Sequence, residues 1–365
     1  MRAFVRADSS RYLGTGHVMR CLTVAQALRR RGIEATFIAR RLPGDITALI
    51  EERGWLVRRL PGIGPAASAS GQLARLRAAL TEDAVLTLAA IGEEQGWLIV
   101  DHYALDARWE AALRPRVRGI VAIDDLADRP HVCEGLLDQG LHADAAARYR
   151  GLVAPHTRLW LGPAYALLRE EFMLAARAAV PRDGAIRRLL ITLGGSDPRN
   201  LTAAALAAVA ALAAPDLAID VVVPPSNPHR ESVARRAAEM PNVTLHGYVE
   251  HMADLMGAAD LAIGAGGTTA WERCALGLPS IMLVLAENQA EVARNVAAAG
   301  AAWNLGEPDE SVRERLYGAL VQALREPGQV CRMSRAALAL MRGAGARWLD
   351  AICTLMEGEL VDGTR

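Results

Sequence analysis

Lysine is absent from the 365 residues, so all 41 basic residues are arginines. Its absence excludes Schiff-base chemistry on a lysine and the phosphate-binding lysine of a P-loop. The 41 acidic residues bring the formal net charge to zero. A balanced charge disfavours general electrostatic binding to nucleic acid or to an anionic membrane. We therefore expect no nucleic-acid partner and no stable membrane association.

Cysteines and long apolar runs are also scarce. The five cysteines are scattered and form no CxxC pair, which disfavours a disulfide framework or a zinc site. Residues 1–8 are too few and too charged for a signal peptide, and no apolar run reaches the ~20 residues of a membrane span. These absences lead us to expect a cytoplasmic protein.

The length and the hydrophobic pattern predict two α/β domains. A chain of 365 residues exceeds a single compact core. Short apolar runs alternate with longer Ala-, Leu- and Arg-containing helical patterns, which is typical of βαβ units around parallel sheets. The expected strands are 3–7, 35–39, 98–100, 119–123, 188–193, 219–223, 243–246, 261–263 and 280–283, with helices at 17–31, 46–53, 69–91 and 107–116.

A helical stretch at 165–181, ending at a proline, is the expected connection between the domains. It predicts an N-terminal domain over 1–175 and a C-terminal domain over 187–342. Two doubly wound sheets would place a ligand at the carboxyl ends of their strands, in a cleft between the domains.

A glycine loop separates the first expected strand from the first expected helix. Gly14 and Gly16 allow a tight turn and a close approach to a ligand. His17 follows at the helix N-terminus, where the helix dipole favours the neutral imidazole that a general base requires. The alternative is a simple turn with a capping histidine, and the residue types leave both open.

A second glycine loop follows the expected strand 188–193. Gly194, Gly195 and Ser196 lead into a helix, an arrangement that binds diphosphates through N–H and hydroxyl groups. The alternative is an Asp-Pro turn in which Asp197 or Asn200 caps the helix.

A third loop follows the expected strand 261–263. It contains Gly267 and Thr268, and Glu272 lies about one helical turn further on, where a carboxylate could accept both ribose hydroxyls. The alternative for Glu272 is a first-turn acid matched to the helix dipole. Two such loops in one domain indicate a phosphate-binding site more strongly than either loop alone.

Polar residues also follow two other strands. Asn288 and Gln289 offer amides to sugar hydroxyl and acetamido groups, unless they only form a turn. Tyr103 offers a hydroxyl and a ring face to a sugar, unless it only packs at a domain edge. The neighbouring His102 is expected to be structural, since no base or metal partner is evident in the sequence.

Acidic residues cluster after the expected strand 119–123. Asp124, Asp125 and Asp128, with His131, invite a metal-binding interpretation. We disfavour it because no distant set of ligands matches the cluster, and Asp124 or Asp125 could order a loop instead. The sequence therefore implies no metal and no cofactor, and leaves the role of the three aspartates open.

Taken in order, these motifs resemble the UDP-sugar hydrolases of pseudaminic acid biosynthesis, which act on UDP-2,4-diacetamido-2,4,6-trideoxy-β-L-altropyranose. The resemblance runs nearly end to end, although related sugar-modification enzymes share several of its blocks. The blocks that carry it are 6–8, 14–17, 101–103, 123–128, 137–139, 148–153, 162–172, 193–198, 227–229 and 262–289. One departure is the run 224–226, Pro-Pro-Ser, where a glycine-containing turn would be expected.

That family is similar to the GT-B glycosyltransferases, so the resemblance implies two Rossmann-like domains facing a cleft. It implies that the C-terminal domain holds UDP and that a final helix within 343–365 packs back on the N-terminal domain. It makes His17 the general base and Glu272 the ribose-binding acid, and it places Tyr103 and Asn288 near the sugar and the reacting water. The full set of expected substrate-binding residues is Gly14, Gly16, Tyr103, Arg169, Gly194, Gly195, Ser196, Gly267, Thr268, Glu272, Asn288 and Gln289.

The expected reaction is metal-independent hydrolysis of the sugar C–O bond with inversion, the departing UDP being stabilised by the glycine loops. Three alternatives stay open: a glycosyltransferase that uses a sugar hydroxyl in place of water, a non-catalytic nucleotide-sugar-binding protein, and a hydrolysing 2-epimerase of UDP-N-acetylhexosamine. The sequence decides neither the sugar stereochemistry nor the oligomeric state.

Overall fold

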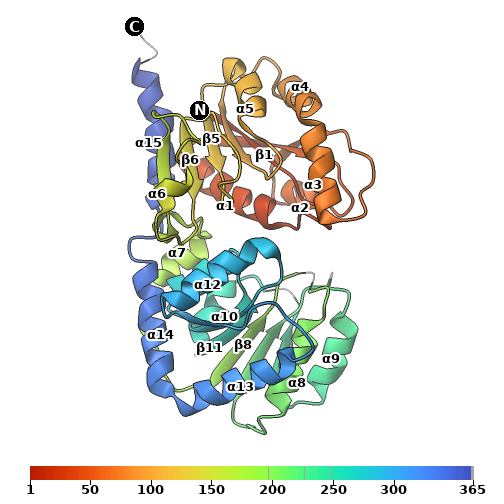
Figure 1. Cartoon of the computed structure of the whole chain (residues 1–365), viewed down its shortest axis with the longest axis vertical. Helices are drawn as coiled ribbons and strands as arrows, with labels where there is room; N and C mark the ends of the chain where they lie inside the picture. The colour runs from red at the N-terminus through yellow and green to blue at the C-terminus, as the bar shows by residue number, and fades with distance from the viewer. Residues whose placement is uncertain (196, 226, 248, 363–365) are drawn as a thin grey trace. The chain divides into compact units, whose positions relative to one another are not determined.

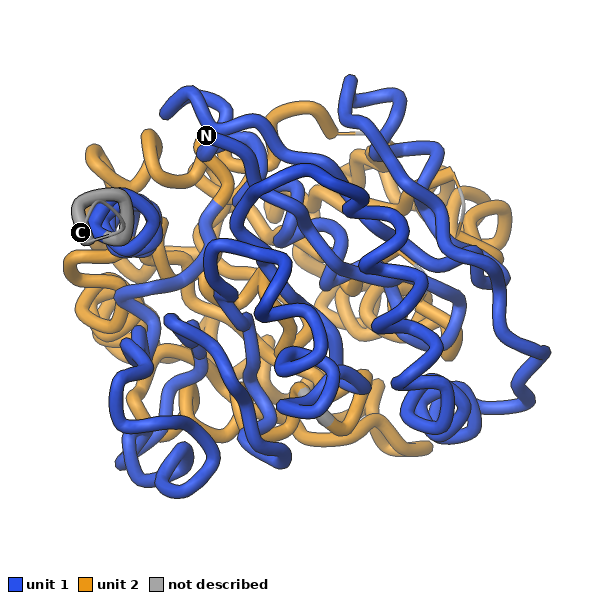
Figure 2. The backbone as a smooth tube through the Cα atoms, turned by 90° about the horizontal axis from the view of Figure 1, so that it is seen from above, with its two compact units in different colours: residues 1–168, 345–365 blue, residues 169–344 orange. Residues whose placement is uncertain are grey.

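The computed structural model describes residues 1–195, 197–225, 227–247 and 249–362, without the side chains of Asn288 and residues 359–362. The chain folds into two compact units (Figure 2). Unit 1 comprises Met1–Leu168 and Gly345–Arg365, and unit 2 comprises Arg169–Ala344. The C-terminal segment thus returns to the unit that contains the N-terminus.

Unit 1 is built on a seven-stranded sheet in the order β3-β2-β1-β4-β5-β6-β7, and every neighbouring pair is parallel. Strands β1, β5 and β6 of this sheet are labelled in Figure 1. Its central strands β1, β4 and β5 are mainly apolar and buried apart from Arg2, as expected of a sheet covered on both faces. The strands are β1 (Arg2–Ala7), β2 (Glu34–Arg40), β3 (Leu56–Leu60), β4 (Trp97–Asp101), β5 (Ile120–Ile123), β6 (Gly135–Asp138) and β7 (Arg158–Leu161).

Side chains of β1 alternate between two hydrophobic cores. Ala3 and Val5 pack in a core with α1 (Gly16–Arg30) and with Trp348 and Ile352 of α15 (Arg347–Asp362). Phe4 packs on the opposite face with α4 and α5. The remaining helices of unit 1 are α2 (Thr47–Glu52), α3 (Ala69–Ala78), α4 (Leu80–Ile91), α5 (Ala107–Leu113), η1 (Arg114–Arg116), α6 (Ala145–Arg148) and η2 (Pro163–Tyr165).

Unit 2 repeats the architecture with six parallel strands in the order β10-β9-β8-β11-β12-β13. One apolar core joins β8, β9, β11 and β12 to helices α8, α9, α13 and α14. The strands are β8 (Arg188–Thr192), β9 (Ala218–Val222), β10 (Val243–His246), β11 (Leu261–Ala265), β12 (Ser280–Leu283) and β13 (Ala302–Asn304). The helices are α7 (Glu170–Ala176), α8 (Leu201–Ala210), α9 (Arg230–Ala238), α10 (Met252–Ala258), α11 (Thr269–Ala275), η3 (Glu287–Gln289), α12 (Ala290–Ala298), α13 (Val312–Arg325) and α14 (Pro327–Leu340).

Each sheet reverses its winding direction at one place, between β1 and β4 in unit 1 and between β8 and β11 in unit 2. Ligands of doubly wound sheets bind outside the carboxyl ends of the strands at such a switch point. In unit 1, β1 and β4 end together at the pair Ala7–Asp101. In unit 2, Thr192 at the end of β8 pairs with Gly264 near the end of β11. The loops that leave these strands are thus the first places to look for a site.

All nine expected strands are present, but four others were missed: β3, β6, β7 and β13. The expected helix 69–91 is two helices, α3 and α4, separated at Ala79. Within the described ranges, none of the helices combines the length and the apolar composition required to cross a membrane.

Candidate active site

At the switch point of unit 1, His17 meets Asp101. His17 is the second residue of α1 and Asp101 is the last residue of β4. His17 Nδ1 lies 2.5 Å from Asp101 Oδ1, and both side chains are buried. An ionised carboxylate is only an acceptor, so Nδ1 donates to Asp101, and in the neutral imidazole the lone pair then lies on Nε2. The pair therefore presents Nε2 as a proton acceptor, as an imidazole–carboxylate base does.

Asp101 also binds Arg20. Arg20 lies one turn after His17 on α1 and binds both Asp101 oxygens, with Nη2 2.7 Å from Oδ1. Burial alone would raise the pKa of Asp101, but Arg20 and His17 hold that pKa well below its usual range. Arg20 Nη1 also lies 2.8 Å from Asp125 Oδ2, after β5. These contacts keep Asp101 ionised and fix the imidazole.

Tyr103 completes the surroundings of the imidazole. Its ring stands edge-on to the ring of His17, with centroids 4.4 Å apart and an interplanar angle of 80°. Asp101 and Tyr103 therefore contact His17 together, from the end of β4 and from the loop that follows it. The sequence indicated roles for His17 and Tyr103 but none for Asp101 or Arg20. The spacing of His17 and Arg20, three residues apart on one helix face, was a signal that could have indicated a shared partner.

The loop before His17 is ordered by its own backbone. Ser10 and Gly14 exchange backbone hydrogen bonds of 3.3 and 2.8 Å, and Gly14 has a φ of +73°. That conformation favours glycine. Gly14 and Gly16 are both exposed, and a Cβ added at either would meet no atom within 4 Å. The loop is therefore exposed at both glycines, and their contact with a ligand stays a prediction.

His102 has a structural role, but for a different reason from the one expected. Its Nε2 lies 3.2 Å from Asp8 Oδ2, and its Nδ1 accepts the Ala104 N–H at 2.9 Å. Arg6 pairs with the same Asp8 and with Asp83, and all these side chains are buried. His102 therefore does have an acidic partner, within an ion network that anchors β1 in the sheet.

The acidic cluster after β5 binds protein groups. Asp124 accepts the Ala127 N–H at 2.9 Å and pairs with Arg129, which also pairs with Asp128. Asp125 pairs with Arg20. In the described part of the chain, no three His, Cys, Asp or Glu side chains gather as a metal site. The cluster thus orders the loop and holds Arg20 beside Asp101.

In unit 2, the loop after β8 begins with Gly194 and Gly195, both exposed, and Gly194 has a φ of +87°. Ser196 lies outside the described residues. Asp197 accepts the N–H groups of Leu201 and Thr202 at 2.8 and 2.9 Å and so caps α8. A carboxylate therefore already occupies the first N–H groups of α8, and a diphosphate would be left with those of the glycines.

The loop after β11 packs against the segment after β12. A Cβ added at Gly266 would lie 2.9 Å from the backbone oxygen of Gln289, and one at Gly267 would lie 3.5 Å from Gln289 Nε2. Gly267 and Thr268 are half-buried. The fold thus brings three of the expected residues, Gly267, Thr268 and Gln289, to one place, whereas the side chain of Asn288 lies outside the described part.

Glu272 and Arg169, both expected to bind substrate, bind each other. Arg169 Nε and Nη2 lie 2.7 and 3.2 Å from the two Glu272 oxygens, and Arg169 also pairs with Glu171. Burial raises the pKa of Glu272, although Arg169 opposes that shift. Each carboxylate oxygen has two acceptor sites, so Glu272 retains capacity for further hydrogen bonds beside Arg169.

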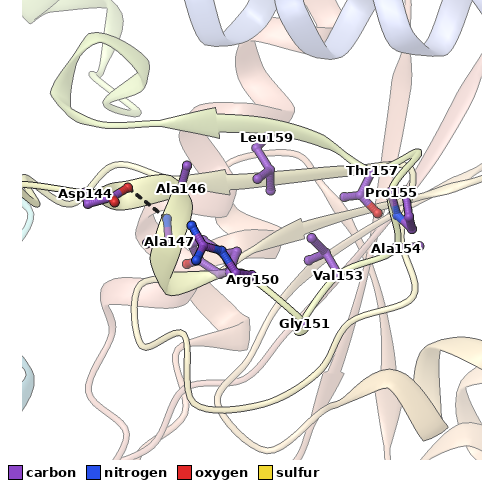
Figure 3. Close-up of a pocket in the computed structure, with 11 residues that line it drawn as sticks. Asp144, Ala146, Ala147, Arg150, Gly151, Val153, Ala154, Pro155, Thr157 and Leu159 are labelled. Atoms are coloured by element: carbon purple, nitrogen blue, oxygen red, sulfur yellow. Dashed lines mark hydrogen bonds between the residues drawn. The ribbon is translucent and has the colours of Figure 1, made fainter.

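A cavity of about 350 Å³ lies elsewhere in unit 1, in the connection from β6 to β7 (Figure 3). Its lining includes Asp144, Tyr149, Arg150 and Thr157. None of the residues that we expected to be functional lines it. The switch point of each unit, taken by itself, is therefore a better candidate for a functional site than this cavity.

The architecture defines the class of this protein. It has the two-domain α/β fold of GT-B proteins, as the sequence resemblance implied. The crystal structure of Acinetobacter baumannii MurG is similar, with a TM-score of 0.60 and 16% identity, covering 98% of this chain and 99% of that chain. Residues 189–346, most of unit 2, match the model of the glycosyltransferase family 28 C-terminal domain.

Two curated proteins are similar over most of the chain. The spore coat polysaccharide biosynthesis protein SpsG of Bacillus subtilis is 29% identical over 320 residues, which is 86% of this chain and 87% of that protein. The UDP-2,4-diacetamido-2,4,6-trideoxy-beta-L-altropyranose hydrolase of Campylobacter jejuni is 25% identical over 265 residues, which is 72% of this chain and 84% of that protein.

Proposed function

We propose that this protein is an enzyme that acts on a nucleotide sugar and hydrolyses the anomeric C–O bond of UDP-2,4-diacetamido-2,4,6-trideoxy-β-L-altropyranose. The observation that carries the proposal is the buried His17–Asp101 pair, because it presents an imidazole lone pair at a ligand-binding edge of the sheet. The similarity to the Campylobacter jejuni hydrolase supports the substrate.

In the proposed reaction, the oxygen of a water molecule attacks the anomeric carbon from the face opposite UDP. The bond from that carbon to the bridging oxygen breaks, and its electron pair leaves with UDP. The proton of the water passes to His17 Nε2, and Asp101 stabilises the imidazolium that results. The anomeric centre is inverted.

Unit 2 would hold the leaving group. The exposed glycines Gly194 and Gly195 offer N–H groups to the diphosphate, as do Gly267 and Thr268. Glu272 would accept ribose hydroxyls with the acceptor sites that Arg169 leaves. The proposal thus assigns the base to unit 1 and the nucleotide to unit 2. The match to a glycosyltransferase C-terminal domain over 189–346 supports this assignment.

A glycosyltransferase is the second candidate, and the same match to a glycosyltransferase family favours it. In that case a sugar hydroxyl replaces water as the nucleophile, and His17 would deprotonate it in the same way. The chemistry differs only in the acceptor, so the presence or absence of an added acceptor separates the two candidates.

The deciding experiment measures UDP release from the proposed substrate in 18O-water, without acceptor, for wild type and His17→Phe. The exposed His156 provides the matched control, His156→Phe. We expect release with the label in the sugar, lost in His17→Phe and kept in His156→Phe. No release without an acceptor would favour the transferase, and label in UDP would contradict cleavage of the C–O bond. An altered configuration at C2 of the product would identify an epimerase.

A further inference from the structure

Arg273 is a fully buried cation with only neutral hydrogen-bond acceptors. Its Nε lies 2.9 Å from Ser280 Oγ, its Nη1 3.2 Å from Thr269 Oγ1 and its Nη2 2.7 Å from the Ala265 carbonyl oxygen. Among the described residues, no carboxylate lies within ion-pair distance of it. Most buried charges are paired, because desolvating an isolated charge is costly.

The neighbouring residues do not supply the missing negative charge. Burial raises the pKa of Cys274 to about 12, so its thiol is neutral at pH 7. Glu272 attracts Arg273 at longer range, but both of its oxygens bind Arg169. Burial lowers the pKa of Arg273 to about 10, which still leaves it charged at neutral pH.

The guanidinium lies directly behind the loop that follows β11. A Cβ added at Gly264 would lie 2.6 Å from Arg273 Nη1, so only glycine leaves room for the guanidinium there. Ala265, whose carbonyl oxygen accepts from Nη2, ends β11. The loop residues Gly267 and Thr268 follow at once. The buried charge therefore acts on any anion in this loop across a medium of low dielectric constant, in which attraction is strong.

Thr269 connects the buried cation to solvent. Its Oγ1 accepts from Arg273 Nη1, and its side chain is exposed. A hydroxyl that accepts one hydrogen bond keeps its own hydrogen to donate. Because hydrogen bonds in a chain polarise one another, the guanidinium makes the Thr269 hydroxyl a better donor to an anion outside.

We propose that Arg273 and Thr269 recognise the negative charge of the substrate's diphosphate, with Thr269 donating directly to a phosphate oxygen and Arg273 acting behind it as a positioning residue. This inference rests on the proposed nucleotide-sugar function and adds to it the residues that distinguish a charged nucleotide from a neutral nucleoside. The phosphate supplies the counter-charge that Arg273 lacks.

The test measures binding of UDP, inorganic pyrophosphate and uridine to the full chain by calorimetry. Thr269→Val removes the hydroxyl at an exposed position and keeps the shape of the side chain. We expect this variant to bind UDP and pyrophosphate about ten-fold more weakly, which corresponds to the loss of a hydrogen bond to a charged group. Uridine affinity should change by less than about two-fold, and Thr269→Ser should restore UDP binding.

Arg273→Gln removes the charge, and Arg273→Lys retains it. We expect the glutamine variant to bind UDP and pyrophosphate about ten-fold or more weakly and to bind uridine with unchanged affinity. The lysine variant should recover part of the lost affinity. In the Arg273→Gln background, Thr269→Val should cost less than about three-fold, since coupled residues are not additive. If Arg273→Gln does not fold, the Thr269 variants and Arg273→Lys still decide the question.

The outcomes separate this inference from the proposed function. The inference, but not the proposed function, is overturned if wild type binds UDP and Thr269→Val binds it with the same affinity. It is also overturned if Thr269→Val loses affinity for uridine as much as for UDP. If wild type binds pyrophosphate and the variants show the expected losses, but wild type binds UDP no more tightly than pyrophosphate, the inference is supported and UDP as the leaving group is contradicted. Absence of binding to both UDP and pyrophosphate contradicts both.

Discussion

His17 Nδ1 lies 2.5 Å from Asp101 Oδ1, which joins the start of α1 to the end of β4 across 84 positions of sequence. The same carboxylate also binds Arg20 through both oxygens. One buried carboxylate thus binds both a histidine and an arginine. These contacts fix the orientation of the imidazole, and the carboxylate would stabilise the imidazolium that forms when His17 takes a proton.

Asp101→Asn should lower kcat for UDP release by about 100-fold or more, with a much smaller effect on KM. The amide keeps the size of the side chain but cannot stabilise an imidazolium, and its NH2 group can reverse the hydrogen-bond direction at Nδ1. Steady-state kinetics of wild type and variant would measure the effect. The exposed Asp183→Asn is the matched control and should leave kcat unchanged. A fully active Asp101→Asn would remove His17 from the role of base.

Arg20→Gln should lower kcat for UDP release by about ten-fold or more, with a much smaller effect on KM. Arg20 binds both oxygens of Asp101 and so fixes the carboxylate that orients the imidazole of His17. Steady-state kinetics together with a melting curve would measure the effect. A variant with a lower melting temperature but an unchanged kcat would show that Arg20 only stabilises the fold, and that result would contradict our prediction.

His131 should make unit 1 less stable in alkali. Burial would lower its pKa, but Glu110, 2.7 Å from Nδ1, and Asp124, 3.8 Å from Nε2, raise it to about 9. The unfolded value is near 6.5. Between these values the folded state holds a proton that the unfolded state releases, so the contribution is complete below about pH 6.5 and is lost as pH rises through about 9.

The loss attributable to His131 should not exceed about 3.5 kcal/mol of unfolding free energy. Urea unfolding of wild type and His131→Gln at pH 6, 8 and 10 would measure it. The unfolding free energies of the two proteins should become more similar as pH rises. The exposed His156→Gln should differ from wild type by the same amount at every pH. A wild-type excess of stability that persists at pH 10 would mean that His131 is not a buried cation.

Glu272→Gln should weaken the binding of UDP by about ten-fold and change the affinity for inorganic pyrophosphate by less than about two-fold. The reason is that the carboxylate would contact the ribose and not the phosphates. An amide has one acceptor oxygen, which Arg169 already uses in part. Calorimetry with UDP and its 2′,3′-dideoxy analogue tests the contact: the analogue should bind both proteins alike. The exposed Glu239→Gln serves as control. Equal losses for UDP and the analogue would exclude a ribose contact.

The buried strands were predictable because they are short apolar runs that alternate with helical patterns. The missed strands lack one or more of these signals. β3, Leu-Val-Arg-Arg-Leu, carries two arginines because it lies at an edge of its sheet. β13 has three residues and is also an edge strand. β6, Gly-Leu-Leu-Asp, has only two apolar side chains in a row, and it is a strand because two neighbours complete its hydrogen bonds.

The sequence by itself determined the fold class, since alternating apolar strands and helices have few compact arrangements. It also indicated His17 and the glycine loops through residue type and position. Only the tertiary structure decided their partners: Asp101 and Arg20 for His17, Arg169 for Glu272, and no carboxylate among the described residues for Arg273. Periodicity reports which face of an element is buried, whereas a contact between charges far apart in the chain depends on which strands the sheet places side by side.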